Sequence, residues 1–315
     1  MKNQMRVVEF LLLGFSSLPE LQLGLFVLFL SLYLSMQMGN ILIVTITLAD
    51  HHLHTPMYFF LRQLSLLEIC YTSVTVPKML ANFLAKRNAI SFAGCAAQLY
   101  FFIALGSVEC TLLAVMAYDR FVAICNPLCY SLIMSKMVCY SLVTSSWISG
   151  FLNSMIHTIF AFRLPFCASN EVKQFFCDIP PLLNLACADT HTSEMLLFVV
   201  GGLYGLGSFL LTLISYVQII SAILKIRTTE GRHKAFSTCT SHLIVVALFF
   251  GTSFFMYLRP TSSYSLDQEK LIPVFYAVVT PTLNPIIYSL RNKEMNAALR
   301  RMFHKSMVCY RNIKK

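Results

Sequence analysis

The sequence predicts an all-α membrane protein, a seven-transmembrane helix bundle with a short cytoplasmic amphipathic helix after the seventh span. Three observations predict this class. Of the 315 residues, 57% are hydrophobic and only 12% are charged, whereas soluble domains average about 25% charged residues. Seven apolar runs are each long enough to cross a bilayer. The excess of basic residues lies between those runs on one side of the predicted membrane, as the positive-inside rule describes.

The seven runs are continuous rather than alternating, which favours helices over the strands of a barrel. Seven spans without an evident repeat disfavour an inverted-repeat transporter. The runs leave an extracellular N-terminus at 1–22, a transmembrane domain at 23–290, and a cytoplasmic helix with a basic tail at 291–315. In chain order, they are residues 23–48, 57–81, 96–118, 139–161, 195–224, 236–258 and 271–290.

The distribution of charge predicts the orientation. The first inner loop, 120–138, 225–235 and 291–315, taken together with the adjoining Asp119, hold fourteen basic and four acidic residues, and the opposite face holds eight of each. The net charge of +10 therefore lies on one face, which places the C-terminus in the cytoplasm and the N-terminus outside. The basic tail then faces the anionic inner leaflet of the bilayer, and nucleic acid is not an expected partner.

Four of the 11 cysteines fall at the predicted outer face, where disulfides persist. Four cysteines allow three pairings, and sequence alone does not choose among them. The even spacing favours a loop closed by Cys167 and Cys187, with Cys177 tied to Cys95 at the top of the third helix.

No motif indicates an enzyme, because G-x-S-x-G, H-E-x-x-H and phosphate-binding loops do not occur. An intramembrane protease would have only Glu68 and Glu109 as its acid pair. A retinal-binding light receptor needs a lysine in the seventh helix, and 271–290 has none.

Six short motifs occur in order along the predicted spans: GN at 39–40, LHTPMYFFL at 53–61, MAYDRFVAIC at 116–125, SY at 215–216, KAFSTCTSHL at 234–243 and PTLNPIIYSLRN at 281–292. Together they resemble the odorant (olfactory) receptors, a rhodopsin-like family of G-protein-coupled receptors, along nearly the whole chain. The short loop between helices six and seven is similar to the land-vertebrate class. Phe121 and Phe250 stand where the family usually has Tyr, Glu68 stands where Asp is commoner, and the usual amino-terminal glycosylation acceptor is missing.

The resemblance implies a switch at the inner end of the bundle. Arg120 is expected to pair with Asp119 at rest and to meet a heterotrimeric G protein when helix six moves outward. The alternative is a charge pair that only caps the third helix at the headgroups. The other implied members of the switch are Tyr216, His242, Asn284, Pro285 and Tyr288, with Pro285 bending helix seven.

Glu68 and Glu109 are acids within membrane spans, which are rare and functional by default. With Asn40 and Asn284, they match a polar site in the middle of the receptor bundle. Two carboxylates in one site need a proton or a cation between them. The resemblance implies a sodium ion and no other cofactor, and a protonated pair without an ion is the alternative.

The ligand is expected in the outer half of the bundle. Phe102 stands where amine receptors carry an acid, and the helical part of the set has no charge, so it suits a small neutral volatile odorant. Ordinary bundle core is the alternative for any single member. The resemblance further implies a plasma-membrane receptor that raises cyclic AMP through a stimulatory (olfactory) G protein. The set is Phe102, Ile103, Gly106, Ser107, Cys110, Val200, Gly201, Tyr204, Phe250, Ser253, Phe254, Tyr257, Val274 and Ala277, with Asp178 and Ile179 from the outer loop.

Overall fold

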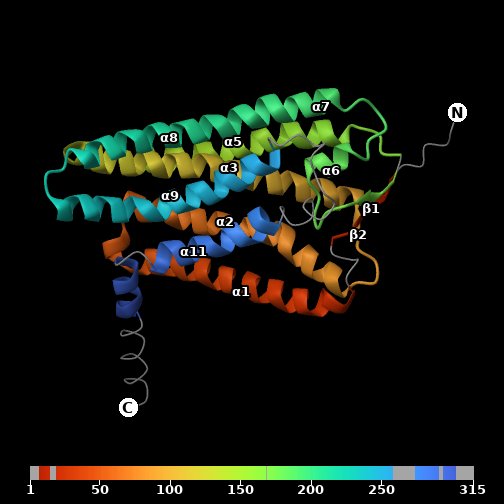
Figure 1. Ribbon diagram of the computed structural model, residues 1–315, viewed down its shortest axis with the longest axis horizontal. Helices are drawn as coiled ribbons and strands as arrows, with labels where there is room; N and C mark the ends of the chain where they lie inside the picture. The colour runs from red at the N-terminus through yellow and green to blue at the C-terminus, as the bar shows by residue number, and fades with distance from the viewer. Residues whose placement is uncertain (1–6, 15–18, 168, 258–273, 291–293, 303–315) are drawn as a thin grey trace, which may run out of the picture.

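The computed structural model describes residues 7–14, 19–167, 169–257, 274–290 and 294–302. Within these residues, long helices lie side by side along the longest axis of the molecule (Figure 1). The amino-terminal strand lies at one end of the bundle, and the last described helix lies at the other (Figure 1). We call these the outer and inner ends.

Seven helical spans correspond to the seven predicted runs in the described part of the chain. Two of them contain a π-helical turn, η3 in the fifth span and η5 in the seventh. The spans are α1 (Pro19–Ala49), α2 (Pro56–Leu84), α3 (Phe92–Cys125), α5 (Lys136–Phe162), α7–η3–α8 (His191–Leu196, Leu197–Gly201 and Gly202–Leu224), α9 (Thr229–Tyr257) and η5–α11 (Phe275–Val279 and Thr280–Leu290).

Length and composition alone mark four helices of the described chain as able to cross a membrane. They are Leu21–Ala49, Phe92–Cys125, His191–Leu224 and Thr229–Phe255. A fifth candidate joins Pro127–Ile133 to Lys136–Phe162 across a bend of 66°. The second span contains three charged side chains, Arg62, Glu68 and Lys78, and is therefore less apolar. Residues 258 and 271–273 of the predicted runs lie outside the described residues.

A small three-stranded sheet covers the outer end, which the sequence did not predict. Its strands are β1 (Glu9–Leu12), β2 (Ala89–Ser91) and β3 (Glu171–Val172), in the order β2-β1-β3. β1 pairs antiparallel with β2 and parallel with β3. These strands are too short to show the alternation of polar and apolar residues that identifies a strand in a sequence.

Two disulfides hold the outer loop that connects the fourth and fifth spans. Cys95 is bonded to Cys177 and Cys167 to Cys187, with Cα atoms 5.6 and 5.9 Å apart. This is the favoured one of the three possible pairings. The backbone N–H of Cys177 also donates to Gln98 Oε1 of α3, at 3.0 Å. The loop therefore has a fixed position at the top of α3.

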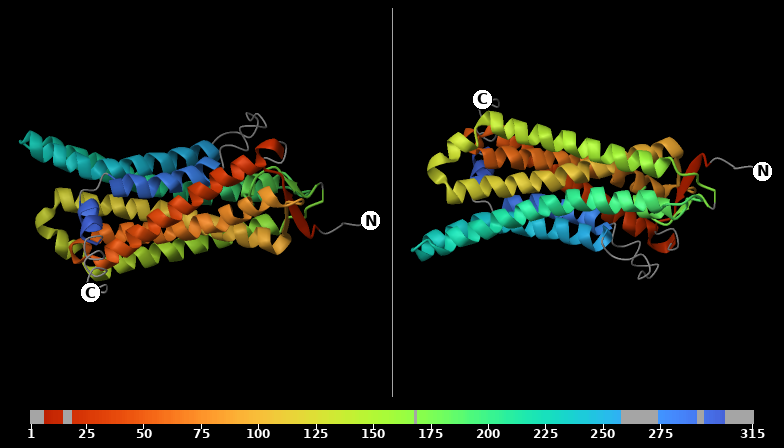
Figure 2. Two further views of the ribbon diagram at one scale, coloured as in Figure 1. Left: turned by 90° about the horizontal axis from the view of Figure 1, so that it is seen from below. Right: turned by 90° about the horizontal axis from the view of Figure 1, so that it is seen from above.

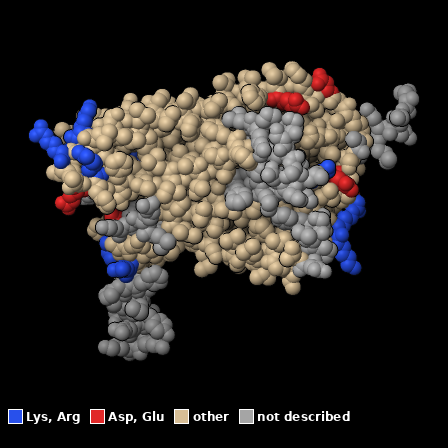
Figure 3. Space-filling model, in the orientation of Figure 1, with Lys and Arg blue, Asp and Glu red and all other residues tan. Residues whose placement is uncertain are grey.

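The inner end contains two 3₁₀ turns, η1 (His51–Leu53) and η2 (Pro127–Cys129), the short helix α4 (Tyr130–Ile133), and helical residues 294–302. The helical segment 294–302 is amphipathic as predicted, because Met295 and Ala298 are buried while Arg300 is exposed. On the face shown in Figure 3, charged side chains of the described residues gather towards the two ends of the bundle, and the described surface between them is uncharged. An uncharged middle band suits the hydrocarbon core of a bilayer.

Glycines allow two helix pairs to approach closely. A Cβ at Gly150 of α5 would lie 2.6 Å from Val108 Cγ2 and 2.8 Å from the Ala104 carbonyl oxygen of α3. A Cβ at Gly39 of α1 would lie 2.9 Å from Pro285 Cβ of α11. Small residues at such crossings let the backbones pack directly, which is how helices associate inside a membrane.

Candidate functional site

Aromatic side chains form the outer half of the predicted ligand site. Phe102 of α3 is buried, stacks on Tyr71 of α2 with ring centroids 5.2 Å apart, and contacts Phe176 of the outer loop at 4.8 Å. Gly106, one turn below, also faces α2, because a Cβ there would lie 3.7 Å from the Tyr71 ring. The outer loop and α2 thus both contribute to the environment of Phe102.

The predicted α3 residues do not all share one face. Ser107 turns towards α5, where its hydroxyl oxygen accepts a hydrogen bond from Asn153 Nδ2 at 2.9 Å. Ile103 and Cys110 are half-buried and pack against the main core. Phe102 and Gly106 are therefore directed to α2, and Ser107 is directed to α5.

The fifth span contributes through the π-helical turn η3, which includes Val200 and Gly201. The His157 ring of α5 lies over Gly201, with Nε2 3.5 Å from the position a Cβ would take. Tyr204, one turn further, bonds through its hydroxyl to Ser149 Oγ of α5 at 2.9 Å. The structure thus brings this part of the predicted set against α5, a helix that the prediction did not include.

The sixth and seventh spans contribute a mainly apolar wall. Phe250 is buried against Phe209 of α8, and Phe254 packs edge-on to the same ring, with centroids 5.3 and 5.2 Å apart. Ser253 is half-buried, and the side chain of Tyr257 lies outside the described residues. Of the seventh-span members, Ala277 is buried and Val274 is partly buried, and both pack in the main core.

The two loop residues of the predicted set are both buried. Asp178 accepts a hydrogen bond from the backbone N–H of Ile179 at 2.8 Å and caps the short helix α6 (Ile179–Leu183). Ile179 packs in a separate outer cluster with Leu99 and Cys177. The side chain of Ile179 therefore stabilises the loop instead of lying beside the helical part of the set.

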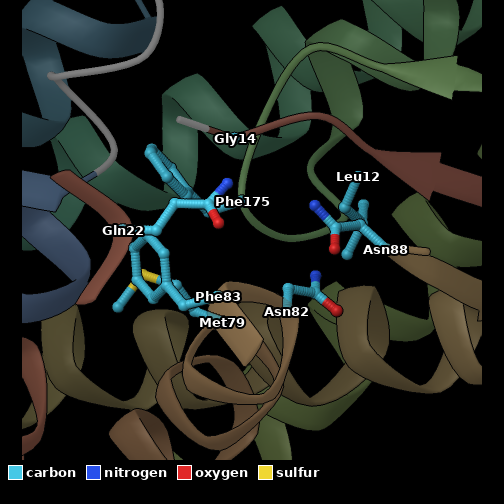
Figure 4. A pocket seen from close by; sticks show the side chains of 8 residues that line it. All are labelled: Leu12, Gly14, Gln22, Met79, Asn82, Phe83, Asn88 and Phe175. Atoms are coloured by element: carbon cyan, nitrogen blue, oxygen red, sulfur yellow. The ribbon is translucent and has the colours of Figure 1, made fainter. Parts of the chain in front are cut away.

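A recess opens at the outer end between α2, the start of α1 and the strands (Figure 4). None of its lining residues belongs to the predicted ligand set. The amides of Gln22, Asn82 and Asn88 surround it together with apolar side chains (Figure 4). Its residues are Leu12, Gly14, Gln22, Met79, Asn82, Phe83, Asn88 and Phe175.

Four polar residues of the predicted mid-bundle site are buried inside the bundle. Asn40, Glu68, Glu109 and Asn284 are each only 1% exposed. Asn284 Nδ2 donates to Glu68 Oε1. Each of the four residues has one side-chain oxygen without a hydrogen-bond partner among the described residues. These atoms are Asn40 Oδ1, Glu68 Oε2, Glu109 Oε1 and Asn284 Oδ1. Buried oxygen atoms of this kind need a hydrogen-bond donor, such as a protonated carboxyl group or a water molecule, or else a bound cation.

The predicted switch residues gather at the inner end. Arg120 of α3 is buried and lies close enough to act electrostatically on Tyr216 of α8, His242 of α9 and Tyr288 of α11. Tyr216 and His242 are joined by a hydrogen bond of 2.7 Å between the hydroxyl and Nδ1. Four spans therefore meet around one guanidinium group.

Asp119 has a partner that the sequence did not indicate. Its Oδ1 accepts a hydrogen bond of 2.8 Å from the hydroxyl of Tyr130, which lies in α4. Asp119 is thus tied to the short helix α4 that follows α3. Pro285 lies inside α11 next to Asn284, and its ring packs against Gly39. The seventh span is therefore held against the first at the proline.

Sequence reasoning missed Asn153, His157, Tyr130 and Tyr71. For the first two, a signal was present, because they are polar residues four apart within an apolar span, and such pairs share one helix face. For Tyr130 and Tyr71, no local pattern identifies the partner, because each contact joins different helices.

Known proteins that are similar to this chain identify its family. The profile of the olfactory receptor family matches residues 29–306. Olfactory receptor 8U9 of Mus musculus is 51% identical over 300 residues, covering 95% of this chain and 96% of the relative. Olfactory receptor 1G1 of Gorilla gorilla gorilla is 53% identical over 301 residues (96% of each chain), and olfactory receptor 10A7 of Homo sapiens is 52% identical over 300 residues (95% of each). The chain is therefore a member of the olfactory receptor family, a G-protein-coupled receptor and not an enzyme.

Proposed function

We propose that this receptor binds small neutral volatile molecules in the outer half of its helical bundle and activates a heterotrimeric G protein of the stimulatory type, which raises cyclic AMP. The single observation that carries the proposal is the buried position of Arg120 at the meeting point of four spans. A charge enclosed in this way becomes accessible only if the helices around it separate.

The composition of the outer half supports a neutral ligand. Phe102, Phe250 and Phe254 present aromatic surface, and Ser107, Ser253 and Tyr204 offer hydroxyl groups. Binding then comes mainly from apolar burial, at about 25 cal/mol per Å². Each hydroxyl adds on the order of 0.5–1.5 kcal/mol through a hydrogen bond. Because a small volatile molecule buries little apolar surface and makes few hydrogen bonds, we expect micromolar affinity and broad tuning.

Helix movement at the inner end links the two sites. The inner ends of α8 and α9 project beyond the other helices (Figure 2). Exposed basic side chains of this region, Lys225 and Arg227, together with the exposed apolar Leu128 of η2, provide a surface for a protein partner. Separation of His242 from Tyr216 would open a cleft beside Arg120 for that partner.

The mid-bundle cluster supports a bound sodium ion. Its oxygen atoms are the ligand type that hard cations prefer. Glu68, Glu109, Asn40 and Asn284 would hold the ion. When bound, the ion supplies the positive charge that allows both carboxylates to be ionised in one site. The receptor needs no other cofactor for this function.

The same proposal includes the orientation in the plasma membrane. The N-terminus is extracellular and the C-terminus cytoplasmic, because the basic excess lies at the inner end. The lipid bilayer is the third partner, and the basic tail has no role in binding nucleic acid. An epitope at residue 1 should stain intact cells, and one at residue 315 should stain only permeabilised cells. The reverse pattern would contradict this orientation.

A screen tests the function. Cells that carry this receptor and a stimulatory olfactory G protein are exposed to a panel of neutral volatile compounds, and cyclic AMP is measured. We expect a dose-dependent rise with several related compounds. A receptor that reaches the surface but responds only to permanently charged molecules would contradict the proposed pocket.

A further inference from the structure

Two polar side chains of α5 are buried inside the bundle, although nothing in the sequence motifs assigned them a role. Asn153 and His157 are 8% and 4% exposed. Asn153 Nδ2 donates to Ser107 Oγ. Two further polar atoms, Asn153 Oδ1 and His157 Nε2, are buried and have no hydrogen-bond partner among the described residues. A buried polar atom without a partner is costly, so each such atom in a folded protein needs an explanation.

The position of these two atoms points to the ligand. Asn153 is bonded to Ser107, and His157 lies over Gly201, with Nε2 3.5 Å from where a Cβ would be. Both neighbours belong to the proposed pocket. Gly201 ends the π-helical turn η3, and π-helical turns inside α-helices occur frequently at functional sites. Helices α3 and α5 run side by side here, with the fifth span alongside (Figure 1).

We propose that Asn153 and His157 form a hydrogen-bonding subsite of the ligand pocket, and that it selects neutral ligands that carry a hydroxyl group. The inference rests on the proposed function and names the ligand class for the same pocket. Residues four apart on a helix have Cβ atoms about 5–6 Å apart. One hydroxyl group placed between them can therefore reach both side chains.

A hydroxyl group fits both atoms for a chemical reason. It can donate its proton to the amide oxygen of Asn153 and accept one from an N–H at His157 Nε2. An ether, ketone or aldehyde has no proton to donate, so it would leave the amide oxygen without a partner. Sites built to bond a hydroxyl group discriminate strongly against analogues that lack it, because their own buried polar groups are then left unpaired.

The test uses matched ligands and matched variants. Straight-chain alcohols of six to ten carbons are compared with their methyl ethers in cells that carry the receptor, with cyclic AMP as the response. Asn153→Ala and His157→Phe each remove one proposed hydrogen bond to the ligand, and Asn153→Ala also removes the bond to Ser107 Oγ. His157→Gln keeps a side-chain amide near the same position. Ser145→Ala is the control, because Ser145 is an exposed residue of the same helix whose hydroxyl bonds only to the Leu142 carbonyl.

We expect the alcohols to be more potent than the ethers on the unaltered receptor. Asn153→Ala and His157→Phe should each raise the half-maximal concentration for an alcohol by about 2- to 13-fold, which corresponds to the loss of one hydrogen bond. The ethers should change little, His157→Gln should retain part of the preference, and Ser145→Ala should behave like the unaltered receptor. Surface staining normalises every response.

Two results separate the possible failures. If the unaltered receptor responds to neutral volatile compounds but treats alcohols and ethers alike, the hydroxyl subsite is wrong while the proposed function stands. Variants that weaken the responses to alcohols and to ethers equally would also overturn the subsite, because that is the result expected if the two residues have only a structural role. If the receptor reaches the surface and no neutral volatile compound acts on it, the proposed function itself is wrong. If the variants do not reach the surface, the ratio of alcohol potency to ether potency on the unaltered receptor tests the subsite, and equal potencies would overturn it.

Discussion

At the scale of single residues, Arg120 is the side chain on which signalling depends in this account. It is a buried residue of α3 that faces side chains of α8, α9 and α11. It lies eighteen residues along α3 from Phe102, a separation of about 27 Å on a helix. Arg120→Ala should therefore leave ligand affinity nearly unchanged and abolish the cyclic AMP response. Arg163→Ala, at the exposed end of α5, is the control that should signal normally. Loss of binding with intact coupling would show that Arg120 has been assigned to the wrong site.

Asp50 should make the stability of the folded receptor depend on pH. Hydrogen bonds from Arg301 and His52 hold the pKa of the Asp50 carboxyl well below its usual range, and Arg301 Nη2 and Nε lie 2.6 and 2.9 Å from Asp50 Oδ2. Since the folded-state pKa is lowered, the ion pair stabilises the receptor above the unfolded-state pKa of about 3.9. That contribution is lost as the pH falls below this value towards the lowered pKa.

Asp50→Asn should accordingly lower the Tm of the detergent-solubilised receptor at pH 7. The difference from the unaltered receptor should shrink as the pH is reduced towards 3. Glu230→Gln, an exposed change on the same inner face, should have little effect at any pH. A Tm difference that stays constant from pH 7 to 3 would show that the carboxylate charge is not responsible.

At the scale of elements, the crossing of α3 and α5 depends on Gly150. Gly150→Ala places a methyl group 2.6 Å from Val108 Cγ2 and 2.8 Å from a backbone oxygen, so one helix must move. Overpacking of this kind costs about 1–3 kcal/mol, and the Tm should fall. Gly205→Ala in α8 is the matched control, because nothing lies within 4 Å of its added Cβ. Equal Tm values for the two variants would rule out a tight crossing.

The outer loop is the second element whose position can be tested. Cys177 is fully buried and joins the loop to α3, and a disulfide of this kind typically contributes about 2–4 kcal/mol. Cys177→Ser should greatly reduce the amount of folded receptor at the surface, whereas Cys70→Ser, an exposed free cysteine of α2, should not. Surface staining measures both variants. Normal surface levels of Cys177→Ser would mean that the other loop contacts suffice.

At the scale of the whole molecule, the membrane spans could be predicted from the sequence. A long apolar run that matches the thickness of the hydrocarbon core must satisfy its backbone hydrogen bonds internally, so it has few alternatives to a helix. The polar cluster of Glu68, Glu109, Asn40 and Asn284 could be predicted because charge inside a span is rare. The sheet of β1, β2 and β3 could not be predicted, because segments of two to four residues pair across distant parts of the chain.

The ligand site was only partly predictable for a related reason. Helical spacing placed Phe102, Gly106 and Ser107 on one helix, but which neighbour each one faces depends on the rotation of α3 within the bundle. The structure turns Ser107 towards Asn153 and Phe102 towards Tyr71. Contacts between helices are set by packing, and no periodic pattern in one helix specifies them.

The central claim is that a neutral ligand in the outer half changes the inner end enough to activate a G protein. Purified receptor in lipid nanodiscs, mixed with a stimulatory heterotrimeric G protein, allows nucleotide exchange to be measured directly. We predict that the best neutral volatile agonist accelerates exchange on the G protein, and that the same ligand bound to Arg120→Ala does not. An agonist that binds the unaltered receptor without changing the exchange rate, or an equal acceleration with Arg120→Ala, would contradict the account.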